Sequence, residues 1–206
     1  MSKYIWLFDP GHGGLIEGIY QTRGKRSPVL PDGRILYEGE FNRSIVSRLS
    51  DLCSKNDIEF VNLVYTNLDL PLSKRVNKAN RIHKQDKRGI YVSIHANGFG
   101  NGKNFNSAHG ISTFYHVSSK KGAKIAKLFQ KNLVKHTHLR DRGAIGNSRW
   151  ANFYVLRKTN MPAILTENGF MTNLKEAKLL LSSEFRDKIA QAHFQTILEI
   201  ENNDLY

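Results

Sequence analysis

Short apolar segments alternate along this chain with longer stretches in which apolar residues recur every three or four positions. In one such stretch Phe41, Ile45 and Leu49 share a helical face, with Cys53 beside them as a small core residue. The predicted helices are 40–55, 73–84, 119–136, 174–181 and 183–200, and the predicted strands are 5–8, 58–65, 90–94, 111–117, 153–156 and 163–166. Strands that alternate with helices predict an α/β sheet with helices on its faces.

Three long polar segments, 13–37, 98–109 and 139–152, separate these elements. The first is rich in glycine, proline and arginine, and its residues 31–34 (Pro-Asp-Gly-Arg) predict a short hairpin. Loops of this length in a compact domain usually carry function. No repeat, low-complexity linker or change of composition divides the sequence, so we expect residues 1–206 to form one domain.

Composition narrows the class of protein. The 206 residues are 40% hydrophobic, which favours a folded core over disorder. A single cysteine excludes an internal disulfide framework and a cysteine-rich metal site. No apolar run approaches the roughly 20 residues of a membrane helix, and the first apolar run is shorter than the roughly 7–15 residues of a signal-peptide core.

The charge balance is strongly basic, with 31 Lys and Arg against 18 Asp and Glu and a net charge of +13. Such a field attracts polyanions, among them nucleic acid, anionic membranes and bacterial wall polymers. The basic residues are scattered, however, and the lysines of 119–136 have the spacing of a solvated helix face. We therefore expect neither a specific nucleic-acid partner nor insertion into a membrane.

Two histidines lie where predicted strands end. His12 follows the first strand within a glycine-rich turn, and His95 follows the strand 90–94. Catalytic groups gather at strand ends of α/β sheets, and two imidazoles on adjacent parallel strands would lie within reach of one metal ion. Without cysteine ligands, nitrogen and oxygen would have to hold a zinc ion. Asp9 is a candidate to cap the turn or to orient a histidine ring. The alternative is an incidental histidine in a glycine turn and a hydrogen-bonded histidine in the core.

Two kinds of carboxylate complete the candidate site. Glu38 and Glu40 flank Gly39 just before the first long helix, where one of them need only complement the helix dipole and the other is free to act as a ligand. Glu167 ends the strand 163–166 ahead of a turn predicted at Asn168-Gly169. A buried, unpaired carboxylate is costly, whereas beside a metal site it is a candidate general base.

In this order the motifs resemble the zinc-dependent N-acetylmuramoyl-L-alanine amidases, which cleave bacterial peptidoglycan. The resemblance covers residues 4–198. It rests on four motifs and two smaller echoes, namely 9–14 (Asp-Pro-Gly-His-Gly-Gly), Glu38-x-x-x-Asn42, 93–97 (Ser-Ile-His-Ala-Asn), Glu167-x-Gly169-Phe170-x-x-Asn173, Leu72-Ser73-x-Arg75 with Ala79-Asn80, and 154–157 (Tyr-Val-Leu-Arg) ahead of 161–163 (Met-Pro-Ala).

The resemblance implies a twisted, mostly parallel sheet of about six strands flanked by helices. It makes His12, Glu38 and His95 the ligands of one zinc ion, with Glu38 preferred to Glu40 because it lies four residues before Asn42, and Glu167 the catalytic carboxylate. The implied reaction is hydrolysis of the amide between the lactyl group of N-acetylmuramic acid and the L-alanine of the stem peptide. Three protein ligands leave a coordination position open for water.

The resemblance also carries expectations about setting. The implied partner is bacterial peptidoglycan, with anionic wall polymers drawn to the basic surface in place of a separate wall-binding domain. A chain without a signal peptide resembles a phage endolysin, which implies cytoplasmic synthesis and release to the wall by a separate route such as a holin. Two alternatives are a zinc carboxypeptidase or other peptidase on a similar fold, and a non-catalytic basic module that binds wall glycan or nucleic acid.

The remaining basic candidates have weaker patterns. Arg142, Arg149 and Arg157 lie in or near the loops that are expected to form the walls of a substrate groove. They are candidates for contacting substrate carboxylates, but the simpler interpretation of each is an ordinary surface or loop residue, and none is assigned to the site. Six further histidines lack a partner pattern and are interpreted as structural or exposed: His83, His109, His116, His136, His138 and His193.

Overall fold

The computed structural model describes residues 2–146 and 152–203 and contains a six-stranded sheet in the order β4-β1-β5-β8-β6-β7. The pairings β1–β4, β1–β5, β5–β8 and β6–β7 are parallel, and β6 runs antiparallel to β8. The strands are β1 (Ile5–Pro10), β4 (Phe60–Asn62), β5 (Gly89–Asn97), β6 (Ile111–Tyr115), β7 (Asp141–Ile145) and β8 (Ala163–Phe170). The predicted α/β class and the mostly parallel sheet are confirmed.

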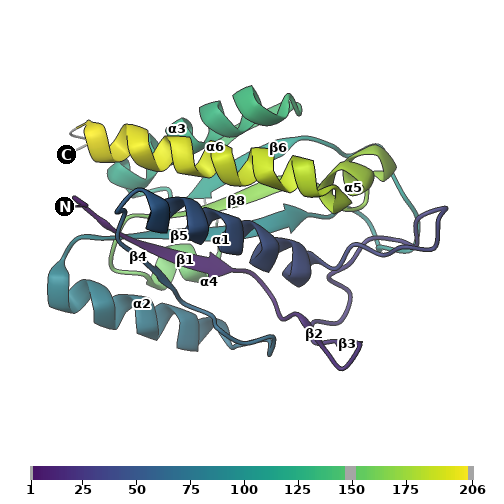
Figure 1. The fold of residues 1–206 in the computed structure, drawn as a ribbon, viewed down its shortest axis with the longest axis horizontal. Helices are drawn as coiled ribbons and strands as arrows, with labels where there is room; N and C mark the ends of the chain where they lie inside the picture. The colour runs from purple at the N-terminus through teal and green to yellow at the C-terminus, as the bar shows by residue number, and fades with distance from the viewer. Residues whose placement is uncertain (1, 147–151, 204–206) are drawn as a thin grey trace.

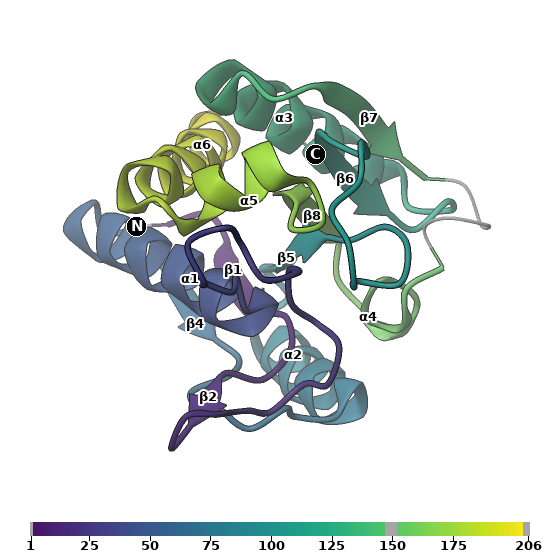
Figure 2. The ribbon, with the colours of Figure 1, turned by 90° about the vertical axis from the view of Figure 1, so that its right-hand side faces the viewer.

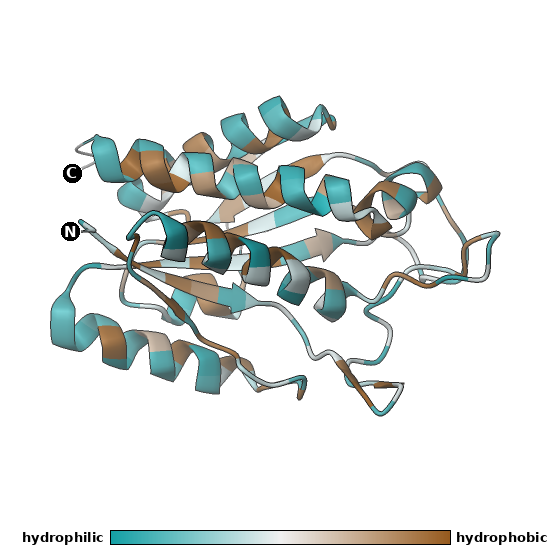
Figure 3. Cartoon of the chain, viewed as in Figure 1, coloured by the Kyte–Doolittle hydropathy of each residue, from teal (hydrophilic) through white to brown (hydrophobic). Residues whose placement is uncertain are grey.

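Helices cover both faces of the sheet (Figures 1 and 2). One face packs against α1, α3 and α6, with α5 docked on α6, and the other packs against α2 and α4. The helices are α1 (Glu38–Lys55), α2 (Leu72–Asp86), α3 (Lys120–Thr137), α4 (Tyr154–Lys158), α5 (Leu174–Leu181) and α6 (Ser183–Asn202). Every one of them carries hydrophilic residues (Figure 3), and none in the described part of the chain is long and apolar enough to cross a membrane.

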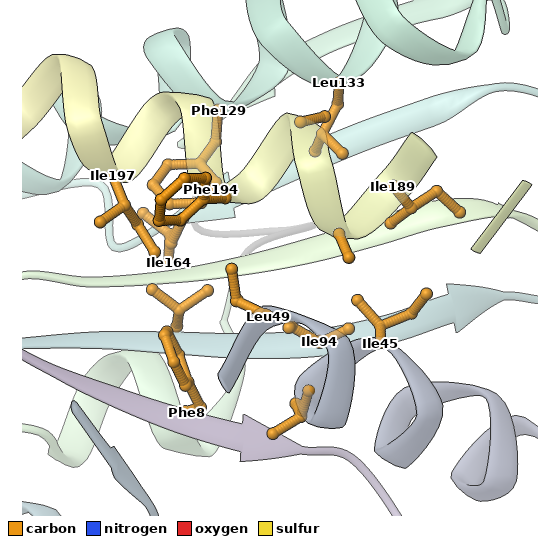
Figure 4. Packing of buried hydrophobic residues seen from close by; sticks show 14 of the residues in the cluster. Phe8, Ile45, Leu49, Ile94, Phe129, Leu133, Ile164, Ile189, Phe194 and Ile197 are labelled. Carbon is orange, nitrogen blue, oxygen red and sulfur yellow. The ribbon is translucent and has the colours of Figure 1, made fainter. Parts of the chain in front are cut away.

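The larger core lies between the sheet and helices α1, α3 and α6 (Figure 4). Phe8, Ile94 and Ile164 contribute from three neighbouring strands, and Leu49 and Phe194 meet them from α1 and α6; all five are at most 4% exposed. Burying a side chain of this size stabilises the fold by about 1.5–3 kcal/mol. Cys53 lies in the same core, as predicted, and burial raises the pKa of its thiol to about 12.

The two ends of the described chain are joined by one carboxylate. Glu201, near the end of α6, accepts hydrogen bonds from the Ser2 hydroxyl (2.9 Å), the Lys3 amide (2.6 Å) and the Trp6 indole N–H (2.8 Å). A buried carboxylate with three donors is satisfied in the way that burial of a charge requires. The start of β1 is therefore tied to the last turns of α6.

Two of the predicted segments were wrong. Residues 154–156 form the start of helix α4 instead of a strand, because a short apolar run does not distinguish the two by periodicity. The segment 139–152 contains an edge strand, β7, whose polar start hid it.

The turn predicted at residues 31–34 joins two antiparallel segments, as expected of a short hairpin. The Leu30 amide donates to the Arg34 carbonyl (2.8 Å) and the Ser27 amide to the Leu36 carbonyl (2.8 Å). Arg26 and Tyr37 form an antiparallel bridge. A second hairpin, which was not predicted, is formed by β2 (Leu15–Ile16) and β3 (Ile19–Tyr20).

Candidate metal centre and catalytic cleft

The turn after β1 places His12 in an unusual backbone conformation. Its φ of 65° lies in the left-handed region, which residues other than glycine seldom occupy. The His12 carbonyl accepts hydrogen bonds from the guanidinium groups of Arg43 (2.9 Å) and Arg75 (3.1 Å). These two cations hold His12 in its strained conformation. Strained residues that are fixed by several surrounding contacts are typical of functional sites.

Gly11 lets β1 approach the neighbouring strand closely. A Cβ atom at this position would lie 2.1 Å from Cε1 of His95, so any side chain would displace the imidazole. The Gly11 amide donates to the Ile94 carbonyl (3.1 Å), and its carbonyl accepts from the Asn42 side-chain amide (3.0 Å). The glycine thus brings the ends of β1 and β5 and the first turn of α1 together.

Asp9 supports the strand end and is not bonded to a histidine ring. Its carboxylate pairs with Arg75 (2.6 Å) and accepts hydrogen bonds from the hydroxyls of Tyr91 (2.6 Å) and Ser93 (2.9 Å). Burial alone would raise the pKa of Asp9, but Arg75 and the Tyr91 hydrogen bond bring it below its usual value. The expectation that Asp9 caps the turn or orients an imidazole is therefore corrected: it anchors Arg75, which holds the His12 turn.

The first turn of α1 separates the roles of the two glutamates. A Cβ atom at Gly39 would lie 1.7 Å from the carbonyl oxygen of Gly13. The glycine therefore lets the start of α1 pack closely against the turn that contains His12. Glu38 is buried and faces the histidines, whereas Glu40 accepts a hydrogen bond from the Leu15 amide (2.6 Å). Glu40 therefore stabilises the β2–β3 hairpin and the loop before α1, and Glu38 remains as the candidate ligand.

His12, Glu38 and His95 form a compact cluster that can hold a metal ion. Glu38 Oε1 lies 3.2 Å from His12 Nε2 and 2.9 Å from His95 Nδ1, and one ligand atom from each residue lies within 4.8 Å of the others. The two imidazole rings are perpendicular, with centroids 5.0 Å apart. The expectation that adjacent parallel strands bring the two histidines together is confirmed.

The charges of this cluster are strongly coupled. Burial alone would raise the pKa of Glu38, but hydrogen bonds from His12 and His95 lower it to about 2. Burial alone would lower the pKa of His95, yet the Glu38 carboxylate raises it above its ordinary value. A carboxylate that stays ionised beside two imidazoles is the state that a cation site requires.

Glu167 faces the same site from β8. It is the parallel-register partner of His95, so both side chains project from the same face of the sheet. Its Oε2 atom is buried and has no hydrogen-bond partner. Burial raises the pKa of Glu167 to about 8, with His95 and Lys25 acting against the rise and the Glu38 carboxylate adding to it. A divalent cation at the cluster would lower this pKa again.

A buried polar chain supports the end of β5. Asn168 donates its side-chain amide to the His95 carbonyl (3.0 Å) and to the Thr166 hydroxyl oxygen (3.1 Å). Thr166 in turn lies 3.1 Å from Nε2 of His193 on α6. The turn predicted at 168–169 is absent, because β8 continues through both residues to Phe170, with an irregular pairing to β5 near Asn97.

The four candidate residues open into one cavity of about 710 Å³. Its walls include residues 23–26 from the first long loop and 97–102 from the second, as predicted. The described part of 139–152 contributes nothing to the lining, which is completed by 69–72 and 153–155. Residues 23–26 (Arg-Gly-Lys-Arg) contain three cations shortly before Glu38. This cluster was the feature of the sequence that could have indicated this part of the cavity wall.

The other basic candidates lie elsewhere. Arg142 stacks over Phe170 with 5.0 Å to the ring centroid, and Arg157 lines a separate surface pocket beside the start of α3. Arg149 lies outside the described residues. None of the six further histidines joins the metal cluster, and His193 is a fully buried structural residue as expected.

The sequence of this chain matches a known protein family over nearly its whole length. The family model described as N-acetylmuramoyl-L-alanine amidase matches residues 7–199. An uncharacterised cell wall amidase of Bacillus anthracis is 34% identical over 94% of this chain, and the endolysin of Bacillus phage SPP1 is 32% identical over 98% of it. The chain spans about a third of the first relative and two thirds of the second: 34% and 67% of their lengths.

Solved structures agree with this assignment. The crystal structure of an N-acetylmuramoyl-L-alanine amidase from Clostridium difficile 630 superposes with a TM-score of 0.81 at 31% identity, covering 99% of this chain and 100% of that one. The catalytic domain of an amidase from Paenibacillus polymyxa gives a TM-score of 0.75 at 27% identity, covering 95% and 97% of the two chains. From its sequence, its fold and the family model alike, this chain belongs to the N-acetylmuramoyl-L-alanine amidase family.

Proposed function

We propose that this domain hydrolyses the amide between the lactyl group of N-acetylmuramic acid and the L-alanine of peptidoglycan stem peptides, with zinc as its metal. The observation that carries the proposal is the convergence of His12, Glu38, His95 and Glu167 on one open cavity. A purely structural cluster would not leave the Glu167 Oε2 atom buried without a partner.

The donor set suits zinc. Two imidazole nitrogens and one carboxylate oxygen are a ligand set of catalytic zinc sites, which keep a fourth position open. Ligand atoms about 2.0–2.2 Å from zinc in tetrahedral geometry lie roughly 3.3 Å apart, close to the 3.2 Å between His12 Nε2 and Glu38 Oε1. Bound zinc would supply Lewis-acid polarisation of the amide carbonyl and a water of lowered pKa.

The protein residues would supply the remaining steps. Glu167 would accept the proton of the attacking water at its buried Oε2 atom and return it to the departing alanine nitrogen. Arg43 and Arg75, through the His12 carbonyl, would keep one ligand oriented, and Asn168 would do the same for His95. The cleft walls would exclude bulk water once substrate fills the cavity.

The metal is tested by elemental analysis of the purified protein. We expect about one zinc per chain in the wild type and almost none in a His12→Ala/His95→Ala double variant. Full zinc occupancy in that variant would place the metal elsewhere.

The reaction is tested by digestion of purified peptidoglycan and analysis of the products. An amidase releases stem peptides with a new N-terminal L-alanine and leaves free lactyl groups on the muramic acid. A peptidase on the same fold would cut between amino acids instead, and a binding module would give no product. Either of the last two outcomes would replace the proposal.

We also propose that the basic surface draws the domain to the wall, where it acts lytically as an endolysin does. Helix α3 contains six lysines and no acidic residue. Anionic wall polymers are the polyanions that such a surface would meet beside peptidoglycan. Pelleting with purified walls across a sodium chloride series tests this part, and binding that is independent of salt would refute it.

A further inference from the structure

The catalytic cavity has one strongly cationic wall. Arg23, Lys25 and Arg26 line it within four consecutive residues, and all three side chains are exposed. Arg26 donates a hydrogen bond to the Ser27 carbonyl (3.3 Å). Within residues 2–146 and 152–203, the side chains of Arg23 and Lys25 have neither a hydrogen bond nor an ion pair. Two cations at the edge of the cleft are thus available to a ligand.

This wall is attached directly to the metal cluster. The Lys25 carbonyl accepts a hydrogen bond from the amide of Glu38 (3.0 Å), and the Lys25 amide donates to the Thr22 carbonyl (3.3 Å). Two residues later the Ser27 amide donates to the Leu36 carbonyl (2.8 Å). Lys25 is therefore fixed at its backbone to the first residue of α1, which carries the candidate ligand.

The acidic residues of the cavity leave these cations unmatched. Asp9 and Asp69 both pair with Arg75, and Glu38 pairs with the two histidines. Glu167 alone remains, and the Lys25 ammonium acts on it electrostatically without a contact. The two unpaired cations therefore favour a negatively charged group of the substrate at this wall.

The charge of the wall suits one side of the scissile bond. Lys25 lines the same cavity as Glu167 and the candidate metal ligands. The lactyl carboxyl is taken up in the scissile amide, so the N-acetylated glycan offers no charge there. The stem peptide carries the carboxylates next to this amide, and the cationic wall therefore suits the peptide and not the glycan.

We propose that Lys25, assisted by Arg23, binds a carboxylate on the residue that follows the L-alanine and so favours stem peptides in which this carboxylate is free over those in which it is amidated. This inference rests on the proposed amidase function. It makes Lys25 a specificity-determining residue, and it identifies the substrate class as acidic stem peptides.

The test uses two synthetic muropeptides that differ by one functional group. One is N-acetylmuramyl-L-alanyl-γ-D-glutamyl-L-lysine amide, with a free α-carboxylate on the glutamyl residue, and the other is its D-isoglutaminyl counterpart. Arg23 and Lys25 are exposed, so solvent screens part of their attraction for a carboxylate. We expect the wild-type zinc enzyme to favour the first substrate by roughly fivefold in kcat/KM.

Matched variants assign the preference to the wall. Arg23→Met/Lys25→Met should cleave both substrates with equal kcat/KM, and the ratio of the two values is the readout because loss of Lys25 also changes the charge that acts on Glu167. Lys25→Arg should keep most of the preference. Lys84→Met, an exposed lysine of α2 outside the cavity, should keep all of it. Zinc content is measured for each variant, because the Lys25 backbone is bonded to Glu38.

The outcomes are distinguishable. Equal rates on both substrates with the wild type, or a preference retained in the double methionine variant at full zinc content, would overturn the inference and leave the amidase function intact. Failure of the wild type to cleave either muropeptide would overturn the amidase proposal itself, and the inference with it.

Discussion

His193 should make this domain sensitive to acid at the far end of the hydrogen-bonded chain that runs through Thr166 and Asn168 to the His95 carbonyl. The side chain is fully buried on α6, with Nδ1 2.8 Å from the Ile189 carbonyl and Nε2 3.1 Å from the Thr166 hydroxyl. A carbonyl only accepts, so Nδ1 carries the proton and Nε2 accepts one from Thr166. Burial lowers the pKa of His193 to about 4, with the Ile189 hydrogen bond acting weakly against the shift.

The sign and size of the effect follow from linkage. Above pH 6.5 the imidazole is neutral in both the folded and the unfolded chain and contributes no pH dependence. Below pH 6.5 His193 becomes protonated in the unfolded chain but stays neutral in the folded one. The free energy of unfolding therefore falls as the pH falls. From an unfolded pKa of about 6.5 to a folded pKa of about 4, the loss amounts to roughly 3 kcal/mol.

The assay is urea unfolding at pH 7.5, 6, 5 and 4, with metal removed by chelation so that metal release does not contribute. His193→Gln is the matched variant, because glutamine is polar and does not titrate. We expect the wild type to lose about 3 kcal/mol more than the variant between pH 7.5 and pH 4. Parallel losses in the two proteins would refute the burial argument.

Three further predictions concern the site and the surface. Glu167→Gln should retain zinc but lower turnover about 10²–10⁴-fold, as measured on purified peptidoglycan; near wild-type lysis would assign the base elsewhere. Gly11→Ala should weaken zinc binding in a chelator competition by at least about tenfold, because its Cβ would lie 2.1 Å from the His95 ring; unchanged affinity would contradict the close approach. Lys124→Gln/Lys127→Gln on the exposed face of α3 should make wall binding in the pelleting assay less dependent on salt but leave turnover on a soluble muropeptide unchanged. An unaltered salt dependence would exclude α3 as the surface that contacts the wall.

The spacing of apolar residues predicted the central strands and most helices, because apolar residues recur regularly in those elements. It failed where this signal is missing. The edge strand β7 opens with the polar Asp141 and Arg142, and α4 buries only the adjacent pair Val155 and Leu156. A five-residue helix is too short to display its own period.

Of the candidate site, the sequence predicted the ligands and the carboxylate but not the residues that support them. His12, His95 and Glu167 were visible because each interrupts an apolar strand, and the choice of Glu38 over Glu40 depended on family spacing. The supporting contacts were not visible. That two guanidinium groups meet at the His12 carbonyl, or that Asp9 anchors Arg75, depends on residues that lie 31, 63 and 66 positions apart. Nothing in the local sequence specifies such pairings.

The hydrogen bonds of Glu201 to the first described residues determine where the two ends of the domain lie. Since Ser2 and Lys3 are bonded to Glu201, the chain enters and leaves the fold at neighbouring points. These points lie beside the amino end of β1 (Figure 1). The candidate metal ligands lie at the opposite end, with His12 just after β1 and His95 in the last residues of β5. Such a domain can be inserted into another chain, circularly permuted, or extended at either end without covering the edge that carries the candidate metal ligands.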